Sequence, residues 1–495
     1  MAELKQVATT MRNYTSPISS SNIHLKEFIV PIILAVSDYI AVLIAIWSAY
    51  SIRVYLVPIF LPLPPLQVLP NVYHYLAIPL AVIFFMHFDK MYVRRLLLWN
   101  QIEKVFKVSI YAILLILTIL YITEEAKYTS RLFLGLIWIF CFIGLSTSRY
   151  LVKKILIAID MWQIPVVIVG AGKTGELLFN VFQQDSGMGY KVIGLIEDRP
   201  LVANTFKGIP VIGTFATAEK AIQHLNIKNV IVAAPGLARE DLVSLIYRLQ
   251  PYVKNITFVP DLFGIPVGAI ELDTLFYEKT ILLTVRNNLT RWYNRVLKRI
   301  FDVVATLVGG LIISPLFAVI SILIYLDSTG PIIFAHKRVG ENGGTFPCYK
   351  FRTMIPNAQE VLEKYLAESP EGRIEWEQDY KLKEDPRITK IGHFLRRTSL
   401  DELPQLLNVI RGEMSLVGPR PIIHDEIKKY GDYISDYYLV RPGMTGLWQV
   451  SGRNDVDYDT RVRMDSWYVR NWSLWLDIVM IFKTIRVVLG RQGAY

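Results

Sequence analysis

The chain has 495 residues, of which 53% are hydrophobic and only 19% are charged, and its formal net charge is +10. This composition is too apolar for a purely soluble protein of this length, and the positive charge suits a protein held against an anionic membrane surface. The sequence shows no basic groove interleaved with aromatic residues and no known nucleic-acid-binding module, so we expect no nucleic-acid partner. The length allows two or three domains. The two cysteines, Cys141 and Cys348, lack disulfide or zinc spacing, which fits a reducing compartment.

A polar tail, residues 1–27, comes first and carries no cleavable signal peptide. Residues 28–150 are expected to form a bundle of four transmembrane helices. The first, Phe28–Tyr50, is long enough to cross a bilayer, whereas the other three apolar runs are shorter than the usual ~20 residues. These three runs are approximately Tyr73–Phe88, Val105–Tyr121 and Leu132–Ser148.

The distribution of positive charge predicts the orientation of this bundle. Basic residues gather between the second and third segments and after the fourth, whereas the loop between the third and fourth carries Glu124 and Glu125. We therefore expect both ends of the bundle in the cytoplasm. Asp38, in the first segment, is expected to face other helices and is assigned no role. The basic residues are Lys90, Arg94, Arg95, Lys104, Arg149, Lys153 and Lys154.

Residues 163–287 change to alternating strands and helices, which predicts a Rossmann-like parallel α/β domain. After its first strand, Gly170, Gly172 and Gly175 form the Gly-x-Gly-x-x-Gly pattern of a dinucleotide-binding loop, and Glu197 or Asp198 closes the second strand. An enzyme of the short-chain dehydrogenase type would need a Tyr-x-x-x-Lys pair, which this region lacks. We expect a regulatory or nucleotide-binding domain, and a glycine-rich turn without a ligand is an equally open alternative. The predicted strands are Pro165–Val169, Tyr190–Glu197, Asn229–Ala234 and Asn255–Pro260.

Residues 288–495 form the third region, which opens with a basic and aromatic helix suited to the headgroup level of a membrane. The uncharged stretch Val303–Leu326 is long enough to span a bilayer. However, Ser314 and Pro315 lie at its middle, where proline kinks a helix, and both flanks are basic. We expect a re-entrant hairpin at about 301–326 that enters and leaves on one face. A fifth spanning helix is the alternative, and it would put the rest of the chain outside the cell.

An acidic pair, Asp401-Glu402, precedes Pro404 and an apolar helical run. Because proline costs little in the first turn of a helix, that helix should begin at or just before Asp401. The two carboxylates would then lie at the positive end of the helix dipole, which is also a natural phosphate site. One carboxylate could attack phosphorus, or both could hold a divalent cation. The alternative is an ordinary acidic helix start with arginine partners.

Several cations surround this pair in the sequence, most of them in segments punctuated by glycine or proline. Such rigid loops suit the binding of a diphosphate, to which arginine gives bidentate contacts. The candidate phosphate-binding residues are Lys350, Arg352, Arg396, Arg420, Arg338 and Arg453.

Together these motifs resemble the bacterial polyprenyl-phosphate phosphoglycosyl transferases of the monotopic type. The four-helix, Rossmann-like and transferase layout is similar to the long members of that family. The closing stretch Ser451–Tyr495 is most similar to the undecaprenyl-phosphate galactose phosphotransferases, although glucose-transferring members share nearly all motifs. Two mild departures are Glu413, where many members have Asp, and His336, where Gln is common. The matching blocks are the Ser314-Pro315 hairpin, Phe346–Met354, Leu395–Asn408, Met414–Pro421 and Pro442–Arg453.

This resemblance implies a two-step reaction. Asp401 would attack the β-phosphorus of a UDP-hexose and release UMP, and undecaprenyl phosphate would then take the phosphosugar from the aspartate. It also implies Mg²⁺ near Asp401, with Glu402 as a ligand or base, a homodimer, and a catalytic domain on the cytoplasmic face of the bacterial inner membrane. The product would start O-antigen, capsule or exopolysaccharide synthesis. UDP-glucose as donor, or a catalytically inactive nucleotide-binding scaffold anchored in the membrane, are the alternatives.

Overall fold

The computed structural model divides the chain into two compact units, Met1–Asp261 and Leu262–Tyr495. Most of the predicted N-terminal tail lies outside the described residues. The described residues are 20–66, 72–198, 205–260, 270–275, 280–285, 288–371, 373, 376, 382, 385–451 and 456–489.

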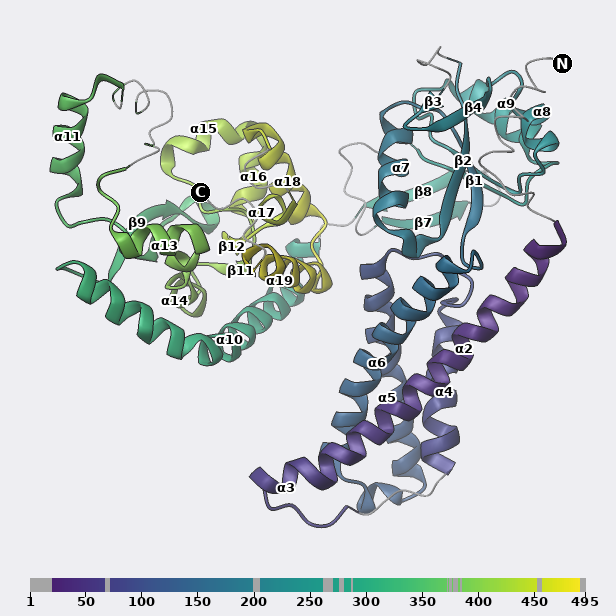
Figure 1. The fold of residues 1–495 in the computed structure, drawn as a ribbon, viewed down its shortest axis with the longest axis horizontal. Coiled ribbons are helices and arrows are strands. Elements are labelled where there is room, and N and C mark those ends of the chain that lie inside the picture. Colours follow the sequence, from purple (N-terminus) through teal and green to yellow (C-terminus); the bar gives the residue numbers. More distant parts are fainter. Residues whose placement is uncertain are drawn as a thin grey trace. The chain divides into compact units, whose positions relative to one another are not determined.

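The first unit begins with a helical bundle (Figure 1), and each of the four predicted apolar segments is helical. Within the described ranges, four helices are long and apolar enough to cross a membrane, namely Phe28–Phe60, Leu98–Ile122, Arg131–Ala158 and, in the second unit, Trp292–Asp327. The remaining predicted segment, Tyr73–Phe88, is a shorter apolar helix. The elements are α2 (Ser20–Ser51), η1 (Ile52–Leu56), α3 (Val57–Phe60), η2 (Tyr73–Ala77), α4 (Ile78–Phe88), α5 (Leu98–Ile122), η3 (Glu125–Tyr128) and α6 (Arg131–Ala158).

A buried ion pair joins α2 to α6 inside this bundle. Asp38 and Arg149 are almost completely excluded from solvent. Arg149 Nη2 lies 2.7 Å from Asp38 Oδ2, Nε donates to Oδ1 at 3.0 Å, and Nη1 donates to the Met91 carbonyl oxygen at 3.2 Å. Burying two charges is costly unless they are paired and hydrogen-bonded, and this geometry meets both conditions. Asp38 therefore faces another helix, as expected.

The α/β part of the first unit is a six-stranded sheet in the order β3-β4-β2-β1-β5-β6. Neighbouring strands are parallel except for β3, which is antiparallel to β4. Along β1, Val166 and Ile168 pack in the cluster that includes α7, whereas Val167 and Val169 pack in the one that includes α8 and α9. Helices thus cover both faces of the sheet, which confirms the predicted parallel α/β domain. The elements are β1 (Ile164–Val169), α7 (Lys173–Gln184), η4 (Ser186–Met188), β2 (Tyr190–Ile196), β3 (Thr205–Phe206), β4 (Ile209–Gly213), α8 (Ala218–His224), β5 (Asn229–Val232), α9 (Arg239–Leu249) and β6 (Asn255–Phe258).

In its described residues, the second unit combines one long helix with shorter helices and three two-stranded sheets. The β7–β8 and β9–β10 pairs are antiparallel, and β11–β12 is parallel. The elements up to the acidic pair are β7 (Ile270–Leu275), β8 (Thr280–Val285), η6 (Asn288–Thr290), α10 (Trp292–Asp327), β9 (Ile333–Val339), η7 (Glu341–Gly343), β10 (Thr345–Phe351), α11 (Ala358–Glu368), α13 (Lys390–Thr398) and η8 (Leu400–Glu402). The elements after it are α14 (Gln405–Arg411), β11 (Ser415–Val417), η9 (His424–Glu426), α15 (Ile427–Tyr430), η10 (Gly431–Tyr433), α16 (Ile434–Tyr438), β12 (Gly443–Thr445), α17 (Leu447–Ser451), α18 (Tyr458–Arg470) and α19 (Leu474–Leu489).

Helix α10 is a single helix of 36 residues that changes direction along its length (Figure 1). Pro315 lies inside it and has no N–H, so the carbonyl oxygen of Leu311, four residues earlier, loses its usual donor. Ser314 Oγ donates to that oxygen at 2.8 Å. The structure thus shows one continuous helix in place of the expected hairpin with a connecting turn, and the serine hydroxyl donates to the carbonyl oxygen that the proline leaves without its usual donor.

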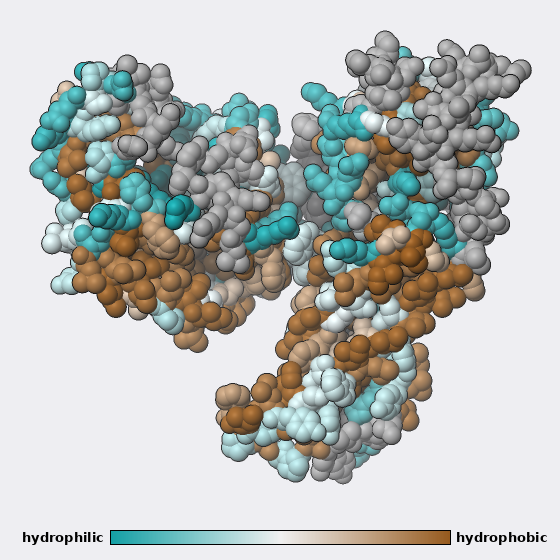
Figure 2. Space-filling view, in the orientation of Figure 1, coloured by the Kyte–Doolittle hydropathy of each residue, from teal (hydrophilic) through white to brown (hydrophobic). Residues whose placement is uncertain are grey.

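The surface of α10 is apolar and largely exposed. Leu311 is 77% exposed and Ile312 is 74% exposed, and apolar surface gathers over this helix in Figure 2. Only a few of its side chains, such as Ile320 and Ile324, are buried, and these pack in a cluster with Phe351 of β10. Such a continuous exposed apolar surface is typical of contact with a membrane.

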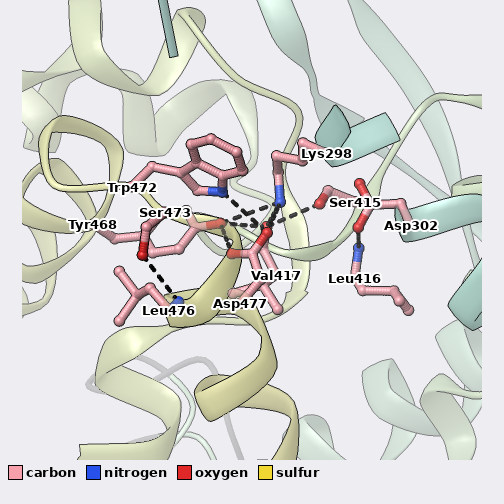
Figure 3. A network of polar contacts seen from close by, with 10 residues as sticks. All are labelled: Lys298, Asp302, Ser415, Leu416, Val417, Tyr468, Trp472, Ser473, Leu476 and Asp477. Carbon is pink, nitrogen blue, oxygen red and sulfur yellow. Dashed lines mark hydrogen bonds and ion pairs between the residues drawn. The ribbon is translucent and has the colours of Figure 1, made fainter. Parts of the chain in front are cut away.

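The N-terminal part of α10 is fixed by a buried polar network (Figure 3). Lys298 Nζ lies 2.7 Å from Asp477 Oδ2 and donates to the carbonyl oxygen of Val417 at 3.0 Å. The fully buried Asp477 also accepts hydrogen bonds from Tyr468 Oη at 2.6 Å and from Trp472 Nε1 at 3.0 Å. Helix α10 is therefore tied to β11, α18 and α19.

Candidate active site

The β9–β10 hairpin supplies cations to one side of the site. In its register Arg338 pairs with Phe346, which lies two residues before Cys348 and four before Lys350. Residues paired across a ladder share one face, and so do alternate residues along a strand. Arg338, Cys348 and Lys350 therefore project from the same face of the hairpin.

The acidic pair lies in η8, a 3₁₀ turn that precedes α14. Pro404 has no N–H to donate to the carbonyl oxygen of Leu400, so the Leu403 N–H donates to it instead, at 3.3 Å. Helix α14 consequently begins only after Pro404, and the prediction that it begins at or before Asp401 is wrong. Asp401 and Glu402 still lie directly before the N-terminus of that helix.

Lys350 connects the two carboxylates. Its Nζ lies 2.7 Å from Glu402 Oε1 and 3.7 Å from Asp401 Oδ2, and the Asp401 side chain is only 13% exposed. Burial raises the pKa of the Asp401 carboxyl above its usual value; the Lys350 and Arg396 cations oppose this effect, and Glu402 adds to it. Burial lowers the pKa of Lys350, but Glu402 and Asp401 more than offset this, so its pKa is raised. Lys350 therefore stays protonated beside a carboxylate that is harder to ionise than usual.

The charges of the site converge around Cys348. Burial raises the pKa of this thiol to about 11, and Lys350, Arg338, Glu402 and Arg420 also act on it. The pKa of Arg338 is lowered first by burial and then by the nearby Arg420 cation. The structure thus brings Arg338 and Arg420 together with the Lys350–Glu402 pair, although they come from separate segments. Cations gathered beside a carboxylate pair suit an anionic substrate.

Three other predicted phosphate-binding residues differ in their positions. Arg396 acts on Asp401 and therefore belongs to the site. Arg352 is buried, and its Nη2 and Nη1 donate to the carbonyl oxygens of Ser328 at 2.6 Å and Thr329 at 2.8 Å. Its two terminal nitrogens tie the end of β10 to the turn after α10, whereas its buried Nε has no hydrogen-bond partner among the described residues. Phosphate binding by Arg352 stays a prediction. Arg453 lies outside the described residues.

Asn408 of α14 positions the strand that carries Lys350, a role that the sequence motifs do not indicate. Its buried amide accepts the Tyr349 N–H at 3.0 Å and donates to the Pro347 carbonyl oxygen and to Glu413 Oε2, both at 2.6 Å. The amide thereby bonds the edge of β10 as a neighbouring strand would. It fixes the strand that carries Lys350 against the helix that follows the acidic pair.

The acidic pair also meets the simplest requirement for a magnesium site. Across the described ranges there is no cluster of three or more His, Cys, Asp or Glu side chains that could hold a metal ion. Asp401 and Glu402 are the two carboxylates of the site that could take part in holding a divalent cation. Mg²⁺ commonly binds through one or two carboxylates together with phosphates and water. In the structure the Lys350 ammonium lies beside both carboxylates, so a metal ion would share them with this lysine.

The glycine loop of the first unit has close packing between strand and helix. Gly170 has a φ of +102°, and a Cβ at Gly175 would clash with the carbonyl oxygen of Gly170, so glycine is required at both positions. Gly172 borders open space. The Ala171 N–H donates to Glu197 Oε2 at 2.6 Å, so the carboxylate that follows β2 contacts the loop itself. Nucleotide binding by this loop stays a prediction.

The second unit thus combines an exposed apolar helix with a carboxylate pair enclosed by cations, which defines a membrane-associated enzyme for phosphate-bearing groups. Residues 293–491 match the family model described as bacterial sugar transferase, and residues 93–260 match the one described as CoA-binding domain.

Three relatives extend this result. The chain is 38% identical over 94% of its length to an undecaprenyl-phosphate galactose phosphotransferase of Salmonella typhimurium and covers 97% of that protein. It is 40% identical over 80% of its length to a UDP-galactose-lipid carrier transferase of Erwinia amylovora and covers 83% of it. It is 32% identical over 67% of its length to a UDP-glucose:undecaprenyl-phosphate glucose-1-phosphate transferase of Escherichia coli and covers 68% of it. The chain belongs to the bacterial sugar transferase family and is a sugar-phosphate transferase, which confirms the resemblance.

Proposed function

We propose that this protein transfers galactose-1-phosphate from UDP-galactose to undecaprenyl phosphate and releases UMP. One observation carries the proposal: the largely buried carboxylate of Asp401 lies near the cations Lys350 and Arg396. Arg338 and Arg420 lie close to the neighbouring Cys348, and the same unit contains the exposed apolar helix α10. The relatives of Salmonella typhimurium and Erwinia amylovora support galactose as the sugar. The reaction would be the first membrane step of O-antigen, capsule or exopolysaccharide synthesis.

The proposed chemistry has two displacements at one phosphorus atom. A carboxylate oxygen of Asp401 attacks the β-phosphorus of the UDP-sugar, the bond from that phosphorus to the bridging oxygen breaks, and UMP leaves with the electron pair. An oxygen of undecaprenyl phosphate then attacks the same phosphorus, and Asp401 leaves as a carboxylate. Lys350, Arg338 and Arg420 would offset the negative charge that otherwise repels the anionic nucleophile.

Magnesium is part of this proposal. Asp401 and Glu402 would hold the ion, which when bound neutralises charge on the diphosphate. Glu402 is more exposed than Asp401 and already accepts the Lys350 ammonium, which favours a supporting role as ligand or base over that of nucleophile.

The membrane placement is the third part of the proposal. In this proposal α10 is a re-entrant helix that enters and leaves the bacterial inner membrane on the cytoplasmic face. The exposed apolar surface of α10 supports contact with a membrane, and its basic flanks support a return to the same face. A cysteine introduced at the exposed Lys364 of α11, in a variant that lacks Cys141 and Cys348, should react with a membrane-impermeant maleimide only after the cells are opened. Labelling in intact cells would refute this placement. A homodimer is also expected.

Release of UMP measures the proposed reaction directly. Purified protein in detergent with Mg²⁺ and undecaprenyl phosphate should release UMP from UDP-galactose and much less from UDP-glucose or the N-acetyl forms. Preference for UDP-glucose would support the alternative donor. No release from any of these sugars, with the protein folded, would support an inactive scaffold.

Replacing Lys350 by methionine is expected to move the acidic limb of the pH–rate profile upward by about one pH unit. The reactive form of Asp401 is the carboxylate, its pKa is raised by burial, and Lys350 lowers it. Without the ammonium the pKa rises further, so activity is lost at a higher pH as the solution is acidified. Lys337→Met, on the adjacent strand, is the matched control and should leave the limb in place. A lower rate with an unmoved limb would mean that Lys350 acts on the substrate alone.

Asn408→Leu is expected to lower kcat at least about tenfold and also to lower the unfolding temperature. The change leaves the Tyr349 N–H and the Pro347 carbonyl oxygen without their partner, at about 1–3 kcal/mol for each buried group. Because β10 then loses its attachment to α14, kcat should fall more than KM rises. Glu413→Gln keeps both bonds to β10 and should change kcat less than about threefold. Equal effects of the two variants would contradict a positioning role for Asn408.

A further inference from the structure

A cavity of about 310 Å³ lies beside the N-terminal half of α10. None of the active-site residues described above lines it. Its lining combines apolar side chains, among them Val296 and Ile300 of α10, with Arg295, Arg299 and Arg441 and with the carboxylates of Asp302 and Glu341. A cavity of this mixed character suits an amphipathic ligand with an anionic group.

Two of the arginines lie close together beside the C-terminal end of α14. Arg299 Nη1 and Nη2 already donate to the carbonyl oxygens of Val409, at 2.5 Å, and Ile410, at 2.8 Å, which holds the guanidinium in place and leaves one N–H of each nitrogen for a ligand. Arg299 Nη2 and Arg441 Nη1 lie 3.4 Å and 3.8 Å from the point where a Cβ of Gly412 would stand.

Arg441 Nε lies 3.2 Å from Glu341 Oε2, in an ion pair that is about one-third exposed. Lys298, which also lines the cavity, is already paired with Asp477. Two neighbouring guanidinium groups repel each other, and an anion between them would turn that repulsion into attraction.

The cavity borders an apolar stripe on α10. Trp292, Val296, Ile300 and Val304 follow one another at intervals of four residues, which places them on one face of the helix. They are 74%, 47%, 55% and 54% exposed, respectively. Since Val296 and Ile300 also line the cavity, an apolar chain could leave it along this stripe and continue over the exposed surface of α10.

We infer that this cavity binds the phosphate group of a membrane lipid. The phosphate lies between Arg299 and Arg441, because planar guanidinium groups match phosphate oxygens in charge and geometry, and the hydrocarbon chain follows the stripe. A bilayer phospholipid and a polyprenyl phosphate share this chemistry. The inference needs α10 at a membrane but not Asp401 as nucleophile, so its failure would leave the proposed reaction standing.

Lipid titration of the full-length protein in detergent tests the inference without any UDP-sugar. Dioleoylphosphatidylglycerol should raise the unfolding temperature saturably, with one lipid retained in native mass spectrometry, whereas dioleoylglycerol and inorganic phosphate should have little effect. Arg441→Gln should weaken phosphatidylglycerol binding about tenfold, because a charge-assisted hydrogen bond is lost. Glu341→Gln should strengthen it, because Arg441 no longer has a competing carboxylate. Arg463→Gln removes the same charge outside the cavity and should change nothing.

Competition with undecaprenyl phosphate distinguishes the two sources of phosphate. If undecaprenyl phosphate displaces phosphatidylglycerol from the wild type, and this displacement depends on Arg441, undecaprenyl phosphate is the natural occupant of the cavity. If it displaces none, the natural occupant is a bilayer phospholipid. Equal phosphatidylglycerol affinity of the wild type and Arg441→Gln would overturn the inference, as would an equal effect of inorganic phosphate. Arg441→Lys keeps the charge, so retained binding in that variant would show that loss in Arg441→Gln is not misfolding.

Discussion

Asp401→Asn is expected to lower transfer of the sugar phosphate at least about a thousandfold and to abolish the phosphosugar–enzyme adduct. The amide has nearly the size of the carboxylate but is a far weaker nucleophile toward phosphorus. UMP release from UDP-galactose and intact-protein mass spectrometry after mixing with UDP-galactose measure the two effects separately.

The matched control for this prediction is Asp459→Asn, which makes the same change at an exposed position in the first turn of α18. That variant should keep the wild-type rate and the adduct. Glu402→Gln should still form an adduct if Asp401 is the nucleophile, although more slowly. An adduct of wild-type mass in Asp401→Asn would assign the nucleophile to another residue.

Asp477→Ala is expected to destabilise the second unit by about 3–5 kcal/mol. The change leaves the buried ammonium of Lys298 without its carboxylate and takes an acceptor from Tyr468 and Trp472. Thermal unfolding of the purified protein, followed by tryptophan fluorescence, should show a lower transition temperature, and limited proteolysis should cut the second unit sooner.

A double variant separates the buried charge from the packing. Lys298→Met combined with Asp477→Leu replaces the ion pair by apolar side chains of similar size, and such replacements of buried pairs are often neutral or stabilising. The double variant should therefore be more stable than Asp477→Ala. If it is less stable, the network matters through its hydrogen bonds to Val417, Tyr468 and Trp472 more than through its charge.

Much of the architecture can be predicted from the sequence because it depends on local patterns. Apolar length predicts the helices of the bundle, and the alternation of strands and helices predicts the parallel sheet. The exact course of α10 and of η8 depends on single hydrogen bonds. A proline in each segment removes a backbone donor. In α10 the Ser314 hydroxyl donates to the Leu311 carbonyl oxygen instead, whereas in η8 the Leu403 N–H donates to the Leu400 carbonyl oxygen and forms a 3₁₀ turn. The sequence shows the prolines but not which group replaces the missing donor.

In the active site, too, the sequence predicts the residue types and motifs but not their hydrogen-bond partners. Asp401, Glu402, Lys350 and the arginine-bearing loops stand out as residue types and motifs, and most of them come together. Arg352 is indistinguishable from Arg338 in the sequence, yet its two terminal nitrogens donate to the turn after α10, because partners so far apart in the chain are decided by tertiary packing.

Asn408 carries a signal that can be read in the sequence. It is a polar residue within the apolar run Leu406–Ile410, where a buried amide must find hydrogen-bond partners. That pattern alone could have marked it as a structural residue. It could not have indicated that the partners lie on β10.

The attachment of α10 also bears on the order of events during synthesis. Lys298 is separated by 119 residues from Val417 and by 179 residues from Asp477, its two closest partners in the network. Helix α10 therefore leaves the ribosome long before the carboxylate that neutralises Lys298 exists, and contacts of such long range form late. If α10 lies in the membrane as proposed, we expect it to reach the lipid before it docks onto its own domain. A chain that ends before α19 would leave Lys298, in the N-terminal part of α10, without its carboxylate partner. We therefore expect the transferase unit to become stable only after α19 has been synthesised.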